Sequence, residues 1–514
     1  MLVSASGSQP DDRARPVEPS AHPSERSPAG GEPGRTGHVT GTAVDAIVVG
    51  AGPNGLAAAI TLARAGRSVR VYEAASEAGG GTRTAELTLP GFLHDVCSTV
   101  MSLTAISPFF ASVDLAARGV ELVHSDAPVA HPLDGGRAVV LERSVEATRV
   151  GLGGRDGRAW QRLFGPLVRD AGKLGPEILR PIVHVPRHPL ALARFGLPAL
   201  RSADGLARGR FEDEAARALF AGIAAHSMLN LKRPLTASFG LVLATFAHAF
   251  GWPVVRGGAA AVTAALVAEL ESAGGEVVTG HRVDALPDLP PARAVLFDVT
   301  PRQLVAIAGD RLSPRTRRRA EQFRYGSGVF KVDWALDGPV PWTADGPRRA
   351  ATVHLGGTLE EIAASEAAVA AGRHPDRPYV LFVQYFPWDE SRAPEGKTTA
   401  WAYCHVPAGS TVDMTDRIEA QVERFAPGFR DLIVGRATHG PAQMEAYDAN
   451  YVGGDINGGI QDIRQLIFRP WPTIDPYRVG GGMYLCSSST PPGGGVHGMS
   501  GMLAAHSALR HELS

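Results

Sequence analysis

Residues 44–55 read VDAIVVGAGPNG and decide the fold. The first six form a short apolar run, as expected of a buried parallel strand, and the rest contain a GxGxxG motif. In this motif Gly50 permits a tight turn, Gly52 lets the backbone approach a pyrophosphate, and Gly55 lets the following helix pack on the strand. The spacing therefore predicts a dinucleotide site, with the phosphates at the N-terminus of a helix.

The sequence after the glycines supports this prediction. Residues 55–65 are rich in Ala and Leu at helical spacing, and residues 68–72 (SVRVY) predict a second strand, so the stretch forms a βαβ unit. Glu73 follows this strand, 21 residues after Gly52, where a carboxylate binds a ribose. An acid at this position disfavours the 2′-phosphate of NADP. The motif alone does not distinguish NAD from FAD.

A second glycine cluster, GGGTRT at residues 79–84, narrows the choice. It resembles the extended signature of FAD-dependent amine oxidases and phytoene-dehydrogenase-related oxidoreductases, in which the glutamate is followed by two glycines, an Arg and a Thr or Ser. Gly81 stands where many members carry a first Arg, so Arg83 would have to supply that contact. The resemblance also includes residues 89–98 (LPGFLHDVCS), 453–469 (GGDINGGIQDIRQLIFR) and 485–498 (LCSSSTPPGGGVHG).

The resemblance covers roughly residues 44–510 and implies an α/β protein that binds FAD. The implied architecture is a Rossmann-like FAD-binding domain of the glutathione-reductase type, with an inserted α+β substrate domain that contains a mostly antiparallel sheet. The cofactor-binding residues that we predict are Gly50, Gly52, Pro53, Asn54, Gly55, Glu73, Gly80, Gly81, Arg83, Thr84, Val283, Gly494, Gly495 and Val496.

The predicted domains are discontinuous. Residues 1–43 are Pro, Gly, Ser and charged residues without apolar periodicity, so we expect a disordered tail. After Gly328, the segments VFKVDWAL, ATVHL, YVLFVQYF and TTAWAYCHV alternate as strands do. The predicted FAD-binding domain comprises residues 44–110, 250–310 and 440–514, and the predicted substrate domain comprises residues 111–249 (helical part) and 311–439 (sheet part).

Composition excludes several classes of protein. With 51 basic and 52 acidic residues the chain has no basic field for nucleic acid. Cys97, Cys404 and Cys486 are widely spaced without a CxxC pair, so neither a disulfide scaffold nor a metal site is expected. The N-terminus lacks the apolar segment of a secretory signal, so we expect a cytoplasmic location. The long uncharged run between Arg233 and Arg256 predicts a buried helix rather than a membrane span.

Two residues are candidates for catalysis. Lys331 is one of only four lysines and lies in an apolar strand, as does a lysine that holds a water against the flavin in amine oxidases; the alternative is an edge lysine that faces solvent. His497 follows the glycine loop at residues 493–495, where it either acts in catalysis or contributes its backbone. Spacing does not choose among the candidate proton acceptors Asp455, Asp462, His226 and His497.

We therefore predict an FAD-dependent oxidoreductase that dehydrogenates a small hydrophobic substrate, such as a polyene or a lipid-like molecule, by hydride transfer to flavin. A flavin amine oxidase, a redox-neutral flavin-dependent isomerase and a low-turnover flavoprotein with an interaction role remain alternatives. Residues 106–110 and 182–200 are apolar and suit a substrate entrance or a peripheral membrane contact, and Arg187, Arg194 and Arg201 recur at intervals of seven in and directly after the second stretch. Its prolines predict an irregular segment, and the oligomeric state stays open.

Overall fold

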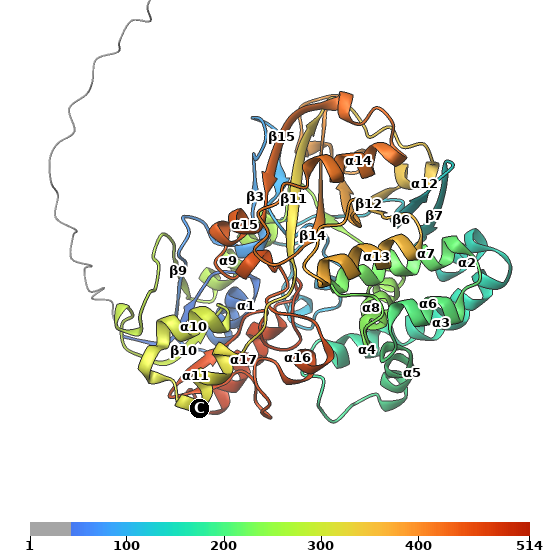
Figure 1. Cartoon of the computed structure of the whole chain (residues 1–514). Helices are drawn as coiled ribbons and strands as arrows, with labels where there is room; N and C mark the ends of the chain where they lie inside the picture. Colours follow the sequence, from blue (N-terminus) through green and yellow to red (C-terminus); the bar gives the residue numbers. More distant parts are fainter. Residues whose placement is uncertain (1–42) are drawn as a thin grey trace, which may run out of the picture. The chain divides into compact units, whose positions relative to one another are not determined.

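The computed structural model describes residues 43–514, which contain two large sheets and the helices that cover them (Figure 1). The expected disordered tail lies outside the described residues, apart from Ala43. The two sheets correspond to the two kinds of domain that the sequence predicts.

The first sheet is Rossmann-like. Its strand order is β16 (Arg478–Gly480), β17 (Met483–Leu485), β10 (Ala292–Phe297), β1 (Val44–Val49), β2 (Val69–Tyr72) and β9 (Glu276–Val278). All neighbours are parallel except β16 and β17. One face packs against α1 (Pro53–Arg64), α9 (Ala260–Ser272) and α17 (Met499–Arg510), and the other face packs against α10 (Pro301–Ala308) and α11 (Pro314–Glu321). These strands come from three separate parts of the chain, residues 44–72, 276–297 and 478–485.

The second sheet is mostly antiparallel, which confirms the prediction. Its strand order is β15 (Ile433–His439), β11 (Gly328–Leu336), β14 (Thr398–Val406), β13 (Val380–Gln384), β12 (Ala350–Leu355), β6 (Ala127–Leu133) and β7 (Arg137–Leu141). Only β12 and β6 pair in parallel. Strands β11 to β14 match the four alternating segments. Strands β6 and β7 were missed, because all seven residues of β6 are buried and its sequence, APVAHPL, does not alternate.

A layer of helices packs against the second sheet. It contains α2 (Val145–Leu152), α3 (Gly154–Arg169), α4 (Ala171–Ile178), α5 (Pro189–Ala199), α6 (Ala203–Arg210), α7 (Glu214–Ala224) and α8 (Thr236–Phe250). Helix α8 occupies the long uncharged run, as expected, and no helix among residues 43–514 is long and apolar enough to cross a membrane. The prediction of an irregular segment at residues 182–200 is wrong in its second half. Pro189 takes the first position of α5, where its missing N–H costs nothing.

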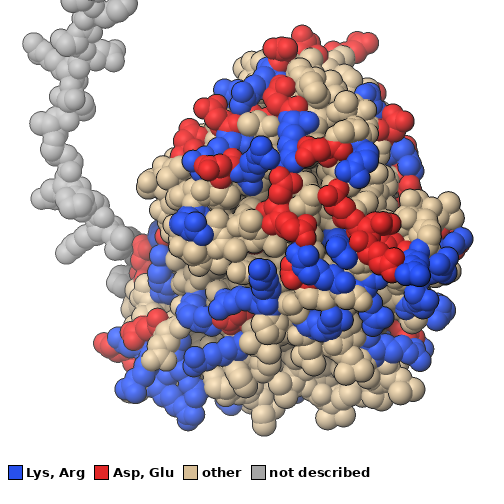
Figure 2. Space-filling model, turned by 45° about the vertical axis from the view of Figure 1, so that its right-hand side comes forward, with Lys and Arg blue, Asp and Glu red and all other residues tan. Residues whose placement is uncertain are grey.

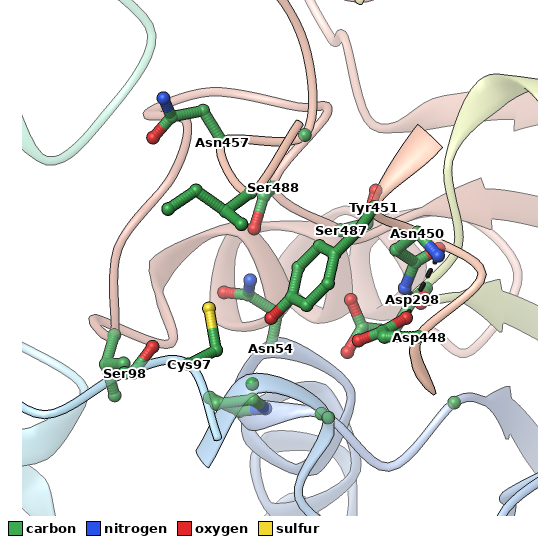
Figure 3. Close-up of a pocket in the computed structure, with 18 of the residues that line it drawn as sticks. Asn54, Cys97, Ser98, Asp298, Asp448, Asn450, Tyr451, Asn457, Ser487 and Ser488 are labelled. Carbon is green, nitrogen blue, oxygen red and sulfur yellow. Dashed lines mark hydrogen bonds between the residues drawn. The ribbon is translucent and has the colours of Figure 1, made fainter. Parts of the chain in front are cut away.

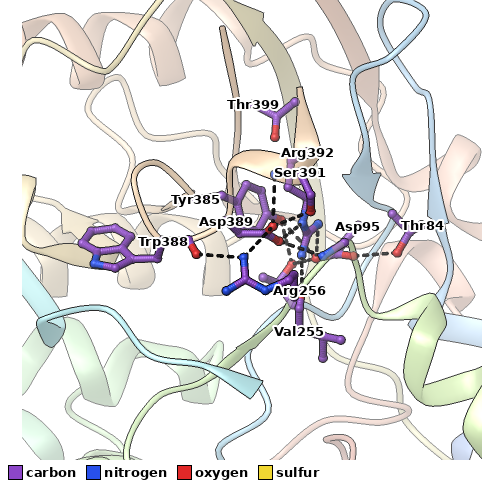
Figure 4. Close-up of polar contacts among 12 residues, drawn as sticks. Thr84, Asp95, Val255, Arg256, Tyr385, Trp388, Asp389, Ser391, Arg392 and Thr399 are labelled. Atoms are coloured by element: carbon purple, nitrogen blue, oxygen red, sulfur yellow. Dashed lines mark hydrogen bonds and ion pairs between the residues drawn. The ribbon is translucent and has the colours of Figure 1, made fainter. Parts of the chain in front are cut away.

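A buried ion cluster joins the two domains (Figure 4). The Arg392 guanidinium is 1% exposed and donates to Asp95 Oδ2 at 3.0 Å and Asp389 Oδ2 at 2.8 Å. Its third bond, to the Val255 carbonyl at 2.8 Å, reaches β8 (Val254–Val255). Asp95 also accepts a 2.8 Å bond from Thr84. Thr84, which was predicted to bind the cofactor, therefore contributes to this cluster instead. The remaining elements include β3 (Thr84–Ala85), β4 (His94–Asp95), β5 (Leu122–Val123), α12 (Asp345–Arg348), α13 (Leu359–Ala370), α14 (Thr415–Phe425), α15 (Pro441–Tyr447) and α16 (Ile463–Phe468).

Candidate functional site

A cavity of about 820 Å³ lies between the carboxyl ends of the first sheet's parallel strands and one face of the second sheet. Its size falls within the ~300–1,000 Å³ that is usual for ligand and cofactor sites. On the side of the first sheet the lining includes Glu73, Val283 and Asp298, and on the side of the second sheet it includes Trp401 and Tyr403. A ligand that fills the cavity must therefore contact both domains.

The predicted glycines pack where side chains would not fit. A Cβ at Gly52 would lie 2.7 Å from Asp298 Oδ2, and a Cβ at Gly55 would lie 2.0 Å from the Gly50 carbonyl oxygen. The second glycine cluster meets the first, because a Cβ at Gly80 would lie 3.2 Å from the Gly52 Cα. Asn54, at the start of α1, is buried and its Oδ1 has no hydrogen-bond partner among the described residues. This arrangement leaves the backbone of the two glycine clusters and the amide oxygen of Asn54 free to contact a ligand.

Glu73 is fixed at the end of β2 by backbone donors. Its Oε2 accepts a 2.8 Å bond from Ala51 N, and its Oε1 accepts a 2.9 Å bond from Ala75 N. Arg83 lies 3.3 Å from Oε1 and 5.3 Å from the centre of the Tyr447 ring. A carboxylate has about four lone-pair sites, so Glu73 keeps acceptor capacity for ribose hydroxyls.

The structure shows what limits position 81 to glycine. A Cβ at Gly81 would lie 2.4 Å from Tyr451 Oη, so any larger residue would displace this tyrosine. Tyr451 lies in the cavity wall beside Cys97 and Asn54 (Figure 3). Arg83 also lines the cavity, as expected if it takes over the missing contact.

Two buried acids near the glycines were missed by the sequence analysis. Asp298 Oδ2 accepts a 2.8 Å bond from Gly55 N, and Asp448 lies on the same side of the cavity (Figure 3). Burial, together with the nearby charges of Asp448 and Glu73, raises the pKa of Asp298 to about 8, and burial also raises the pKa of Asp448. Asp298 is therefore mostly protonated at neutral pH. It directly follows a parallel strand, where such sheets bind ligands, and this signal could have identified it.

The other end of the cavity is mostly apolar and aromatic. Trp401 and Tyr403 on β14 stack with ring centres 5.9 Å apart and an angle of 19°. Trp252 donates a 2.9 Å bond to Thr352, which satisfies its indole nitrogen. Further lining at this end comes from Val100, Leu103, Leu243, Leu381 and Val383. The acids among the described lining residues are Glu73, Asp298, Glu445 and Asp448, none of which belongs to the second sheet.

A row of imidazoles leads from the cavity into the second sheet, and its inner members, His131 and His354, are fully buried. His226 lines the cavity, and its Nε2 lies 3.0 Å from His354 Nε2 on β12. His131 on β6 donates from Nε2 to the Gly357 carbonyl at 2.6 Å. Burial lowers the pKa of His226 to about 3, aided by His405, and lowers that of His131 to about 4. These rings are neutral at pH 7, and a pKa of about 3 makes His226 a weak proton acceptor.

The structure brings only His226, among the four candidate proton acceptors, to the cavity. Asp455 accepts backbone bonds from Gly326, Asn457 and Gly459, and it shapes a turn. Asp462 accepts a 2.9 Å bond from Gln465 N and caps α16. Both carboxylates therefore bond to the backbone of the protein rather than to a ligand.

The two predicted catalytic residues lie beside the cavity rather than in its wall. Lys331 is 2% exposed, forms an ion pair with Asp333, and has its ammonium 5.1 Å from the centre of the Trp401 ring. It does not face solvent. His497 donates from Nε2 to the Gly493 carbonyl at 3.0 Å and accepts a 3.1 Å bond from Met499 N. Because its loop uses both ring nitrogens, His497 has none left for a ligand.

Most of the predicted cofactor residues meet at the cavity: Gly50, Gly52, Pro53, Asn54, Glu73, Gly80, Gly81, Arg83, Val283, Gly495 and Val496. Gly55 lies behind the wall, in the contact between α1 and β1. Gly494 packs against Asn457, where a Cβ would lie 3.1 Å from the carbonyl oxygen. Within residues 43–514 no cluster of side chains could hold a metal ion.

Comparisons with known proteins agree with this geometry. A family model matches residues 48–113. It describes an NAD(P)-binding Rossmann-like domain. Over 91% of its length the chain is 27% identical to a Rattus norvegicus protein, pyridine nucleotide-disulfide oxidoreductase domain-containing protein 2, of which it covers 93%. The three cysteines of the present chain are unpaired, so that name describes no redox disulfide here.

Two further proteins are similar in part or in fold. One of the subunits of limonene dehydrogenase from Castellaniella defragrans is 33% identical over 124 residues, which are 23% of this chain and 22% of that protein. The structure of wild-type putrescine oxidase bound to putrescine superposes with a TM-score of 0.58 and 18% identity, covering 91% of this chain and 98% of that one. The second similarity shows that the two-domain fold is shared.

Proposed function

We propose that the protein is an FAD-dependent oxidoreductase that dehydrogenates a hydrophobic substrate. The observation that carries the proposal is one continuous cavity, which extends from the GxGxxG motif and Glu73 to the aromatic wall at Trp401 and Tyr403. Similarity to a named oxidoreductase over nearly the whole chain supports it.

The residues at the first sheet fit a flavin dinucleotide. Glu73 would bind the ribose, the N-terminus of α1 would face the pyrophosphate, and Asn54 Oδ1 offers an unpartnered acceptor. Protonated Asp298 removes one negative charge from beside the phosphates. The glycines at residues 493–495 let backbone lie against a flat ring. Bound FAD would supply an acceptor for hydride.

The second-sheet side of the cavity sets the substrate class. Its lining is apolar and aromatic and contains no acid, so it suits an uncharged hydrocarbon skeleton better than a diamine. The similarity to part of a limonene dehydrogenase is consistent with such a substrate. Loss of a C–H hydride leaves a proton to be removed from the neighbouring carbon, and His226, beside His354 of the second sheet, is a neutral although weak base in the cavity wall.

An amine oxidase is the second candidate, because putrescine oxidase shares the fold. The aromatic rings that would favour it are Trp401 and Tyr403, although they stack on each other rather than face each other across a gap. A redox-neutral isomerase and a low-turnover flavoprotein would use the same cofactor site.

The decisive test begins with reconstitution of the purified chain with FAD. We expect tight binding with flavin absorbance bands, and bleaching of these bands under anaerobic conditions by a cyclic monoterpene but not by cyclohexylamine. Peroxide release with the amine would favour the amine oxidase. Product formation without bleaching would favour the isomerase, and failure to bind FAD would exclude all of these functions.

A further inference from the structure

An unusually apolar surface lies on the helical layer, at residues 182–200. Of the thirteen exposed large hydrophobic side chains among the described residues, six fall in these nineteen positions, which shows strong clustering. Val185 is 88% exposed, and Val183 and Leu190 are each 74% exposed. Scattered apolar residues are normal on protein surfaces, whereas a cluster of this kind marks an interaction site.

Helix α5 presents its apolar side to solvent. Leu190, Ala193, Arg194 and Leu197 are exposed and recur at the spacing of one helical face, while Ala191 points inward and is 4% exposed. A surface helix of a globular protein normally shows the opposite arrangement. Apart from Arg194, the outward face of α5 therefore lacks the polar residues that water would favour.

This stretch and the residues that flank it are basic and contain no acid. Residues 178–203 include Arg180, Arg187, Arg194 and Arg201 but neither Asp nor Glu. Arg194 is partly neutralised by Asp170 at 2.6 Å, and Arg201 donates to the Gly205 carbonyl at 2.6 Å. Apolar side chains between arginines are typical of a helix that lies in a membrane interface.

A second exposed apolar segment lies beside the first. It carries Ile463, Phe468 and Ile474. Burial raises the pKa of Tyr477, just after this segment, and the nearby charge of Arg180, just before the first segment, opposes the rise, so the two segments approach each other at these ends. Both segments occupy the lower end of the molecule in Figure 1, and that end is mostly uncharged in Figure 2, with Lys and Arg side chains above it.

We propose that these two segments, the apolar base, dock onto the surface of an anionic lipid bilayer. The apolar side chains would enter the boundary between headgroups and acyl chains, and the arginines would meet the lipid phosphates. A second copy of the chain is a poorer occupant, because a two-fold interface would bring the acid-free arginine stretch against itself. The proposal is independent of the proposed function, since it concerns binding and not turnover.

Sedimentation with vesicles tests the proposal on the full chain. We expect binding to vesicles of phosphatidylcholine with phosphatidylglycerol, weaker binding in high salt, and little binding to phosphatidylcholine alone. The V183E/L197E double variant should bind at least tenfold more weakly. Arg187→Gln, whose side chain has no described partner, should weaken binding about fivefold, as expected for the loss of one basic residue near an anionic surface.

The matched control is V150E/V434E, which places the same two charges at exposed valines outside the apolar base. This control should keep the affinity of the unmodified chain, and thermal unfolding should show that both double variants are folded. Equal binding by the two double variants, or no binding of the unmodified chain to the mixed vesicles, would overturn the proposal. A dimer in vesicle-free solution that V183E/L197E dissociates would also overturn it, in favour of a protein interface.

Discussion

Asp298 is a buried acid at the place where a pyrophosphate would bind, so dinucleotide affinity should depend on its protonation. Burial raises its pKa to about 8. Below that pH the protonated carboxyl does not repel the phosphates, whereas above it the carboxylate does. We expect the dissociation constant for FAD to rise above pH 8, by up to about tenfold per pH unit. Fluorescence titration between pH 6.5 and 9.5 measures this rise.

Asp298→Asn is the control, because it keeps the shape and removes the charge. Its dissociation constant for FAD should stay constant over the same pH range, and an equally steep rise in this variant would assign the titration to another group.

The stability of the ligand-free protein gives a second readout. The carboxyl ionises near 3.8 when unfolded and near 8 when folded, so ligand-free stability should fall as the pH rises through this window. The Asn variant should lose that part of the fall.

Gly222 separates two imidazoles of the row behind the cavity. A Cβ at this position would lie 3.0 Å from His131 Nδ1 and 3.1 Å from His354 Nδ1, and neither nitrogen has a described partner. Ala in a helix is normally more favourable than Gly by about 0.5–1 kcal/mol. We expect Gly222→Ala to lower the stability of the protein instead, because the added methyl group crowds both rings. The variant should also reduce its flavin more slowly, because the crowding shifts His226.

Gly196→Ala in α5 is the matched control for this substitution. Nothing lies within 4 Å of a Cβ at Gly196, so the variant should gain stability in denaturant titrations and keep its rate of flavin reduction. If Gly222→Ala is equally stabilised and equally active, the packing of the imidazole row does not matter for the site.

At the scale of elements, β11 carries a buried pair that the sequence could not reveal. All nine residues of the strand are buried, including Lys331 and Asp333, which lie on the same side and bond to each other. Removing one member of such a pair leaves an uncompensated charge and costs about 3–5 kcal/mol. Lys331→Met should therefore be strongly destabilised in denaturant titrations. The K331M/D333L double variant should regain most of the loss.

The same variants test whether Lys331 acts in catalysis. If it only neutralises Asp333, the double variant should reduce and reoxidise its flavin at the original rates. Slow reoxidation in a stable double variant would instead support the predicted role of Lys331 near the flavin. His94 and His439 also face Asp333, at 3.5 Å and 3.7 Å, so the pair belongs to a larger polar network.

Sequence predicted the elements whose signal is local. The βαβ unit, the glycine clusters and strands β11 to β14 follow from periodicity and spacing. Strand β6 was missed because burial on both faces removes alternation, and α5 was missed because Pro189 was treated as a helix breaker. Asp298 and His226 reach the cavity through contacts between segments far apart in the chain. Such contacts leave no spacing pattern, although the position of Asp298 after a parallel strand was a usable signal.

At the scale of the whole molecule, the cavity is bounded by both domains, so a bound dinucleotide should stabilise both together. The lining includes Gly52 and Glu73 from the first domain and Trp401 and Tyr403 from the second, and Arg392 ties the domains through Asp95. A ligand present at 100 times its dissociation constant adds about 2.7 kcal/mol to the stability of the state that binds it. We expect FAD to raise the unfolding temperature as one transition, and to slow hydrogen exchange in β1 and in β14. Protection confined to β1 would mean that the aromatic wall is not part of the ligand site.

The Arg392→Gln variant should separate the protection of β1 from that of β14. FAD should still slow hydrogen exchange in β1 and should slow it less in β14, because the cluster that holds the second sheet against the first would be broken.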